Sequence, residues 1–108
     1  MVSVLDVITR LWRGWTAREN GDAYEHFLLS ELFPSMRDIP GFVDADVLRR
    51  DDHSEVAFIT LTRFESLGAI RAFAGENYET PVIEPTAQAL LSHYDERAQH
   101  YTTSSYPA

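Results

Sequence analysis

The stretch VAFITLTRFES, residues 56–66, has the β-branched and aromatic content of a strand. Side chains along a strand point alternately to its two faces. One face would carry Val56, Phe58, Thr60, Thr62 and Phe64, and the other Ala57, Ile59, Leu61 and Arg63. Both faces are therefore largely apolar, whereas a strand in so short a chain normally leaves one face to solvent. The pattern predicts that both faces are covered.

Hydrophobic periodicity predicts four strands and three helices along the whole chain. The strands are expected at residues 7–17, 42–50, 56–66 and 96–103, and the helices at residues 22–34, 67–74 and 85–91. Asp22 and Glu25 have the spacing of a capping box, and Pro34 is expected to end or kink the first helix. Ser66 and Gly75 are expected to cap the second helix at its two ends.

This order, with a small extra helix before the final strand, is typical of a split βαβ or ferredoxin-like α+β fold. Such an antiparallel sheet carries its helices on one face and leaves the other face bare. We expect the bare face to carry Ile59 and Leu61 beside Val43, Ala45 and Val47. An apolar patch of that size marks an interface. We therefore expect a homodimer in which two sheets pack face to face as a dimeric α/β barrel.

The composition narrows the possible partners. The 108 residues are expected to form one domain over residues 1–108, with a core at 7–103 and a frayed tail at 104–108. The formal net charge of -8 argues against nucleic acid and anionic membrane surfaces as partners. The chain has no cysteine, and no apolar run reaches membrane-spanning length. We expect a cytoplasmic protein that binds neither nucleic acid nor membranes.

Segments from five parts of the chain share a pattern with one protein family. They are WRGWT, YEHFLLSELFPSMRDIPGF, VLRRDD, FITLTRFESLGAIRAFAGENYE and DERAQHY. Through these segments, residues 7–103 resemble the antibiotic biosynthesis monooxygenase family of dimeric α+β barrels. The resemblance implies the fold and the homodimer. It does not choose the reaction, because the family includes cofactor-free oxygenases of aromatic polyketides, haem-degrading oxygenases and small-molecule isomerases.

The haem-degrading members of that family have a motif that this sequence lacks. The motif combines an Asn in the first strand, a Trp on the second helix and a haem-ligating His after it. Residues 7–17 contain no Asn, Phe73 stands at the Trp position, and Ile83 stands at the His position. Because all three positions depart from the motif, we do not expect haem degradation.

The cofactor-free oxygenases, which the resemblance also implies, require few protein groups. A deprotonated, electron-rich phenol or anthrone can itself reduce dioxygen, so the protein supplies an apolar pocket, a base and hydrogen-bond donors for the oxyanion. Candidate aromatic walls for a pocket between sheet and helices are Trp12, Trp15, Phe27, Phe58, Phe73 and Tyr78. The alternative is that these side chains only fill the core.

Two residues are candidate catalytic groups. Glu31 falls within the apolar arc of the first predicted helix, where a carboxylate facing a cavity would have a raised pKa and could act as a base. The alternative is that Glu31 reaches water or Arg63. His100 lies in the last predicted strand and could be a base or a hydrogen-bond donor in the pocket. Its alternative is a structural histidine in the core or at the dimer interface.

The other histidines, His26, His53 and His93, do not converge with further ligands, so we expect no metal site and no cofactor. The leading functional interpretation is a cofactor-independent monooxygenase of a small aromatic, polyketide-like or quinol-like substrate. The alternative is a non-catalytic dimer that binds a small hydrophobic molecule, or a stress-related protein with the same barrel.

Overall fold

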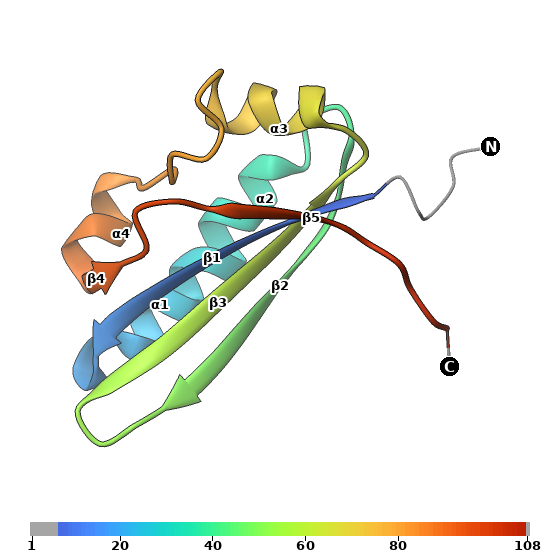
Figure 1. The fold of residues 1–108 in the computed structure, drawn as a ribbon. Coiled ribbons are helices and arrows are strands. Elements are labelled where there is room, and N and C mark those ends of the chain that lie inside the picture. Colours follow the sequence, from blue (N-terminus) through green and yellow to red (C-terminus); the bar gives the residue numbers. More distant parts are fainter. Residues whose placement is uncertain (1–6, 108) are drawn as a thin grey trace.

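A computed structural model describes residues 7–107, and its elements follow the predicted order with one additional strand, β4 (Figure 1). The strands are β1 (Ile8–Ala17), β2 (Phe42–Asp51), β3 (Glu55–Phe64), β4 (Leu91–Tyr94) and β5 (Gln99–Thr102). The helical elements are η2 (Arg18–Asn20), α1 (Gly21–Phe27), η3 (Leu28–Leu32), α2 (Phe33–Met36), α3 (Leu67–Ala74) and α4 (Pro85–Leu90). The predicted domain also included residues 1–6 and 108, which lie outside the described part of the chain.

The strands form one antiparallel sheet in the order β2-β3-β1-β4, with β5 also paired to β1. This is the ferredoxin-like arrangement. The last strand position is shared, because β4 pairs with the carboxyl end of β1 and β5 pairs with its amino end. The sequence predicted β5 but placed Leu91 in a helix and did not predict β4. This segment pairs with Gly14, Trp15 and Thr16, which lie far away in the sequence, so local periodicity does not indicate its extended conformation.

The helices lie on one side of the sheet, as Figure 1 shows, and the burial of β3 alternates accordingly. Val56, Phe58 and Phe64 are buried beneath the helices. The opposite face, which we call the bare face, carries Leu11, Trp15, Leu48, Ile59 and Leu61 in adjacent registers. Within residues 7–107, no helix covers the bare face. None of the helices described there is long and apolar enough to cross a membrane.

The prediction that Ala45 and Val47 of β2 lie on the bare face was wrong. The register of β2 against β3 shifts between Phe42 and Asp44, which changes the phase of the strand. Ala45 and Val47 pair with Thr62 and Thr60, so they point toward the helices. The bare-face positions of β2 are instead Asp44, Asp46, Leu48 and Arg50.

Residues 21–36 form one helical path with a π-helical turn in its middle, η3. The N–H of Phe33 donates to the carbonyl of Leu28, five residues back. Pro34 has no N–H and crowds the carbonyl of the preceding turn, which the wider π turn accommodates. The helical path continues through Pro34 to Met36, so of the two predicted effects of Pro34, ending or kinking the helix, the first does not occur.

The capping predictions had mixed outcomes. Asp22 and Glu25 form no capping box, because α1 begins at Gly21 and Asp22 lies inside it. Both carboxylates instead accept hydrogen bonds from Arg49 of β2, at 2.8 and 2.9 Å. The predicted cap of α3 is confirmed, since the Ser66 hydroxyl accepts from the N–H of Ala69 at 3.1 Å. Gly75 follows α3 with a positive φ of 88°, as a glycine at this end allows.

We expect Gly41→Ala to destabilise the fold by at least about 2 kcal/mol, because Gly41 has a φ of +91°. A Cβ added there would also lie 2.8 Å from the Cβ of Ala69. Urea denaturation would measure the change. The control is Gly68→Ala in α3, whose added Cβ meets only the Ser66 hydroxyl at 3.6 Å and should leave stability unchanged or raised. Equal effects of the two substitutions would contradict this expectation.

Candidate functional site

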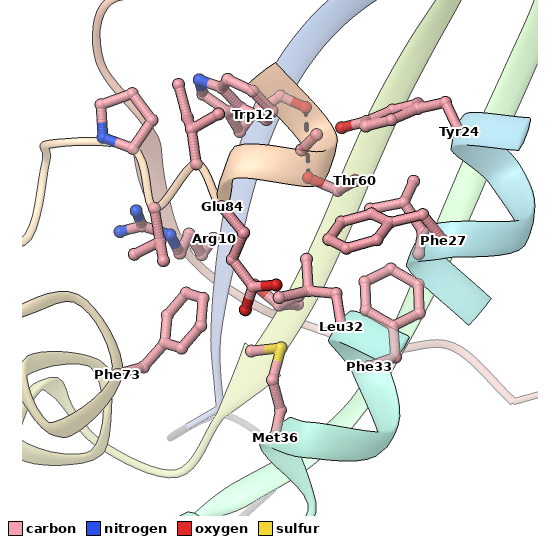
Figure 2. A pocket seen from close by; sticks show the side chains of 16 residues that line it. Arg10, Trp12, Tyr24, Phe27, Leu32, Phe33, Met36, Thr60, Phe73 and Glu84 are labelled. Carbon is pink, nitrogen blue, oxygen red and sulfur yellow. Dashed lines mark hydrogen bonds between the residues drawn. The ribbon is translucent and has the colours of Figure 1, made fainter. Parts of the chain in front are cut away.

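Two buried clusters leave a pocket between the sheet and the helices (Figure 2). One cluster centres on Tyr24, Phe27 and Phe58, and the other on Met36 and Phe64. The pocket is lined by Arg10, Trp12, Tyr24, Phe27, Leu28, Leu32, Phe33, Met36, Thr60, Thr62, Phe73, Pro81, Val82, Ile83, Glu84 and Ala87. The helical path 21–36 and the irregular segment 81–84 thus enclose a space over β1 and β3.

The pocket is narrow. Its cavity volume is about 40 Å³, room for roughly two or three water molecules. Sites for drug-sized molecules commonly offer about 300 to 1,000 Å³. An aromatic ligand therefore requires outward movement of lining side chains or of the segment 81–84.

Arg10 lies at one end of the pocket, beside Phe73 in Figure 2, and only 4% of its surface is exposed. Its Nη1 donates to the carbonyl of Tyr78 and, at 3.0 Å, to Nε2 of His100. Its Nη2 donates to the carbonyl of Thr80 at 3.1 Å. Burial lowers the pKa of Arg10 to about 10, so the guanidinium remains charged at neutral pH. The irregular segment that follows α3 thus holds this cation in place through backbone carbonyls.

Tyr24 and Trp12 form another part of the wall. In Figure 2 the ring of Tyr24 extends toward Trp12 and Thr60. The Tyr24 ring packs edge-on against Phe58, and its burial raises the pKa of its phenol. The indole N–H of Trp12 donates to the carbonyl of Asp95 at 2.8 Å, and Thr60 donates to the carbonyl of Trp12 at 3.4 Å. The indole hydrogen bond fixes the Trp12 ring at the sheet side of the pocket, whereas Tyr24 reaches the pocket from α1.

Glu84 is the acidic residue that lines the pocket within the described part of the chain. It is exposed, so its carboxylate lies where the pocket meets solvent. Glu84 immediately precedes Pro85, the first residue of α4. A carboxylate in this position can accept a proton from a bound molecule and exchange it with water.

Three of the predicted aromatic wall residues line the pocket, namely Trp12, Phe27 and Phe73. Three do not. Phe58 is buried in the core against Tyr24. Tyr78 packs edge-on against His100 and contributes its carbonyl to Arg10. Trp15 lies three residues after Trp12 in β1, so its side chain points to the opposite, bare face of the sheet. There its ring stacks on the ring of His93, with the ring centres 4.5 Å apart.

Glu31 does not line the pocket. The prediction that its carboxylate faces an apolar cavity was therefore wrong. The residue lies in η3 and is exposed. The π turn changes the angular spacing of the residues around the helix axis, so an ideal helical wheel does not place them correctly. The alternative partner, Arg63, instead binds Asp44 and Asp46 at 2.7 and 2.9 Å.

His100 lies behind Arg10 rather than in the pocket lining. An arginine only donates hydrogen bonds, so Nε2 of His100 accepts and its ring proton lies on Nδ1. Nε2 is thus occupied and is not free to act as a base toward a ligand. His100 instead helps to position Arg10, which makes its structural interpretation the better one.

We expect acid to weaken the fold partly through His100. Burial first, and then the charge of Arg10, lower the pKa of His100, whereas Glu79 acts in the opposite direction. Below about pH 6.5 the unfolded chain therefore binds a proton that the folded chain resists, so stability falls as pH falls. Urea denaturation at about pH 7.5 and about pH 5.5 should show a smaller loss in His100→Phe than in the wild type. His26→Gln, an exposed substitution on α1, is the control, and an unchanged loss in His100→Phe would contradict the expectation.

The sequence interpretation missed Arg10 and Glu84. Arg10 lies two residues before Trp12 in β1, so both side chains point to the same face of the sheet. This spacing could have indicated that Arg10 faces the pocket, but arginines usually face solvent. Glu84 lies in a segment without periodicity, so no local pattern indicated its position. Within residues 7–107, no group of three histidines or acidic residues gathers that could hold a metal ion.

No protein-family model matches the sequence, and no curated protein matches it. Solved structures do resemble the fold. A protein from Bacillus cereus provisionally named an antibiotic biosynthesis monooxygenase matches with a TM-score of 0.61 at 17% identity, covering 94% of this chain and 97% of that one. The fold is that of the antibiotic biosynthesis monooxygenases. The sequence resemblance therefore predicted the fold correctly.

Two further structures with this fold have a described activity or ligand. A variant of SnoaB, a cofactor-independent oxygenase from Streptomyces nogalater, matches with a TM-score of 0.58 at 18% identity, covering 95% of this chain and 96% of that one. The monooxygenase ActVA-Orf6 of Streptomyces coelicolor, in complex with Nanaomycin D, matches with a TM-score of 0.63 at 14% identity, covering 97% and 93%. At these identities the likeness extends to the fold alone.

Proposed function

We propose that the protein is a cofactor-independent monooxygenase of a small hydroxylated aromatic substrate, polyketide-like or quinol-like. The observation that carries this proposal is the combination, in one pocket, of aromatic walls, a buried guanidinium and a carboxylate. Two structures with the same fold are described as an oxygenase and a monooxygenase, which supports the reaction class.

The three kinds of group suit chemistry in which the substrate itself supplies the electrons. An anthrone or related substrate would place its oxygen atom at Arg10 and its acidic C–H toward Glu84. Glu84 takes the proton, and Arg10 stabilises the negative charge that develops on oxygen. The resulting carbanion reacts with dioxygen. One oxygen atom replaces the two hydrogens of the CH₂ group as a carbonyl, and the other leaves as water, so no external reductant is needed.

Oxygen uptake tests this proposal directly. The purified protein would be mixed with a panel of anthrones, naphthols and hydroquinones in the presence of a metal chelator. We expect at least one substrate to consume dioxygen in a one-to-one ratio with product, above the rate of the substrate alone. If no member of the panel gives enzyme-dependent uptake although binding is detected, the oxygenase proposal fails.

A non-catalytic ligand-binding protein is the second candidate function. The narrowness of the pocket favours it, since the free space suits a hydrophobic molecule smaller than an aromatic substrate. Stable binding without oxygen uptake would place this candidate first. Binding of no aromatic ligand would argue for a purely structural or stress-related role.

We also propose that two copies pair through the bare face. Leu11 pairs across strands with Leu61, and Ile59 with Leu48, which makes the apolar positions contiguous. Ion pairs of Arg63 with Asp44 and Asp46 border these positions. Two such faces packed by a two-fold axis would bury the apolar side chains of both copies. The pocket lies on the opposite side of each sheet, so each copy would keep its own site.

A further inference from the structure

Arg10 is a buried cation without an acidic partner. Within residues 7–107, no Asp or Glu oxygen lies within 4.0 Å of its guanidinium, although the whole chain has a formal charge of -8. Burying a charge is costly unless it is paired, so most proteins avoid this arrangement. The other partly shielded arginines behave differently. Arg49 binds three carboxylates and Arg63 binds two.

The guanidinium of Arg10 also retains hydrogen-bonding capacity. It carries five N–H groups, of which three serve the carbonyls of Tyr78 and Thr80 and Nε2 of His100. Nε–H and one N–H of Nη2 have no partner among the described residues. Among the described residues, Thr16 Oγ1 is the one side-chain polar atom that is both inaccessible to solvent and without a partner. Nε of Arg10 has no partner either, so it must be accessible. The space that it can reach is the pocket that Arg10 lines.

We infer that Arg10 is the anion-binding group of the pocket and that the ligand binds as its oxyanion. The ligand class is a planar aromatic molecule with an ionised phenol, enol or carboxylate, whose oxygen accepts from the free N–H groups of Arg10. This inference rests on the proposed function, because such an anion carries the negative charge that the substrate acquires at Arg10 once Glu84 has taken its proton.

The surroundings of Arg10 select the aromatic part of such a ligand. The guanidinium carbon lies 5.7 Å from the centre of the Phe73 ring, and the remaining walls are largely apolar. A small hydrated inorganic anion would gain little from these walls, whereas an aromatic anion buries its ring against them. The backbone carbonyls and His100 hold the fork of the guanidinium in one orientation, which favours a planar acceptor.

Matched ligand pairs test the inference on the wild-type protein. The first pair is a hydroxynaphthoquinone with its hydroxyl on the quinone ring, an anion at neutral pH, and its neutral methyl ether. The second pair is naphthoate and naphthamide. By isothermal titration calorimetry we expect each anion to bind about 10- to 100-fold more tightly than its neutral partner. Equal or weaker binding of the two anions would overturn the inference without any substitution.

Variants then assign the effect to one side chain. Arg10→Met should remove the preference for the anion, and Arg10→Lys should retain part of it because charge remains without the planar fork. Arg18→Met is the matched control, since Arg18 is exposed in η2 and contacts the carbonyl of His53. Retention of the full preference in a folded Arg10→Met protein would overturn the assignment. If Arg10→Met does not fold, Arg10→Lys and the wild-type pairs still decide.

The oxygen-uptake assay separates this inference from the proposed function. Preferential binding of anions without oxygen uptake would refute the oxygenase and leave the anion site standing. Oxygen uptake by a protein that binds anionic and neutral partners equally would refute the anion site and leave the oxygenase standing.

Discussion

Glu84→Gln is expected to lower the rate of oxygen uptake by about 10²- to 10⁴-fold, the usual cost of removing a positioned base. Glutamine keeps the size of the side chain but cannot accept the proton that the carboxylate accepts. Glu84 is exposed and makes no ion pair within the described residues, so the fold should survive. The measurement is oxygen uptake at saturating substrate, with thermal unfolding as a check on folding.

Glu31→Gln is the matched comparison for that experiment. Both residues are exposed glutamates beside the same helical layer, but only Glu84 lines the pocket. We expect Glu31→Gln to retain wild-type turnover. The reverse pattern, with turnover lost in Glu31→Gln and kept in Glu84→Gln, would restore the base suggested by the helical periodicity and refute the one assigned from the pocket.

Leu61→Lys is expected to convert a dimer into a monomer. Light scattering of the wild type should give twice the chain mass of 12.3 kDa, and the variant should give that mass once. Leu61 lies at the centre of the bare face between Leu11 and Asp46. A charge buried there costs several kcal/mol, which raises the dissociation constant by about 100-fold or more. Lysine avoids a like-charge contact with Asp46, so the single sheet is not penalised.

A surface substitution on the helical side is the control for the dimer. Leu29→Glu also places a charge at an exposed leucine, which is 53% exposed in η3, away from the bare face. It should leave the mass unchanged. A wild-type protein that scatters as a folded monomer, or a Leu61→Lys variant that remains a dimer, would rule out pairing through the bare face.

Local patterns were sufficient for the order of the elements. Alternation in residues 56–66 and the helical stripe that begins near Tyr24 reflect side-chain periods of two and 3.6 residues, which depend only on neighbouring positions. The same holds for Ser66 and Gly75, whose capping roles act within one helical turn. The sequence by itself thus determined the ferredoxin-like order and the existence of a face without helices.

The tertiary structure decided which side chains meet. A one-residue shift in β2 moved Ala45 and Val47 to the helical side, and the π turn before Pro34 accompanies a Glu31 that faces solvent. The site joins Arg10 of β1 to backbone carbonyls about seventy positions further along the chain and to Glu84 of an irregular segment. Strand pairing and chain packing create these contacts, and neither leaves a periodic signal in the sequence. The buried, unpaired charge of Arg10 therefore became evident only in the folded chain.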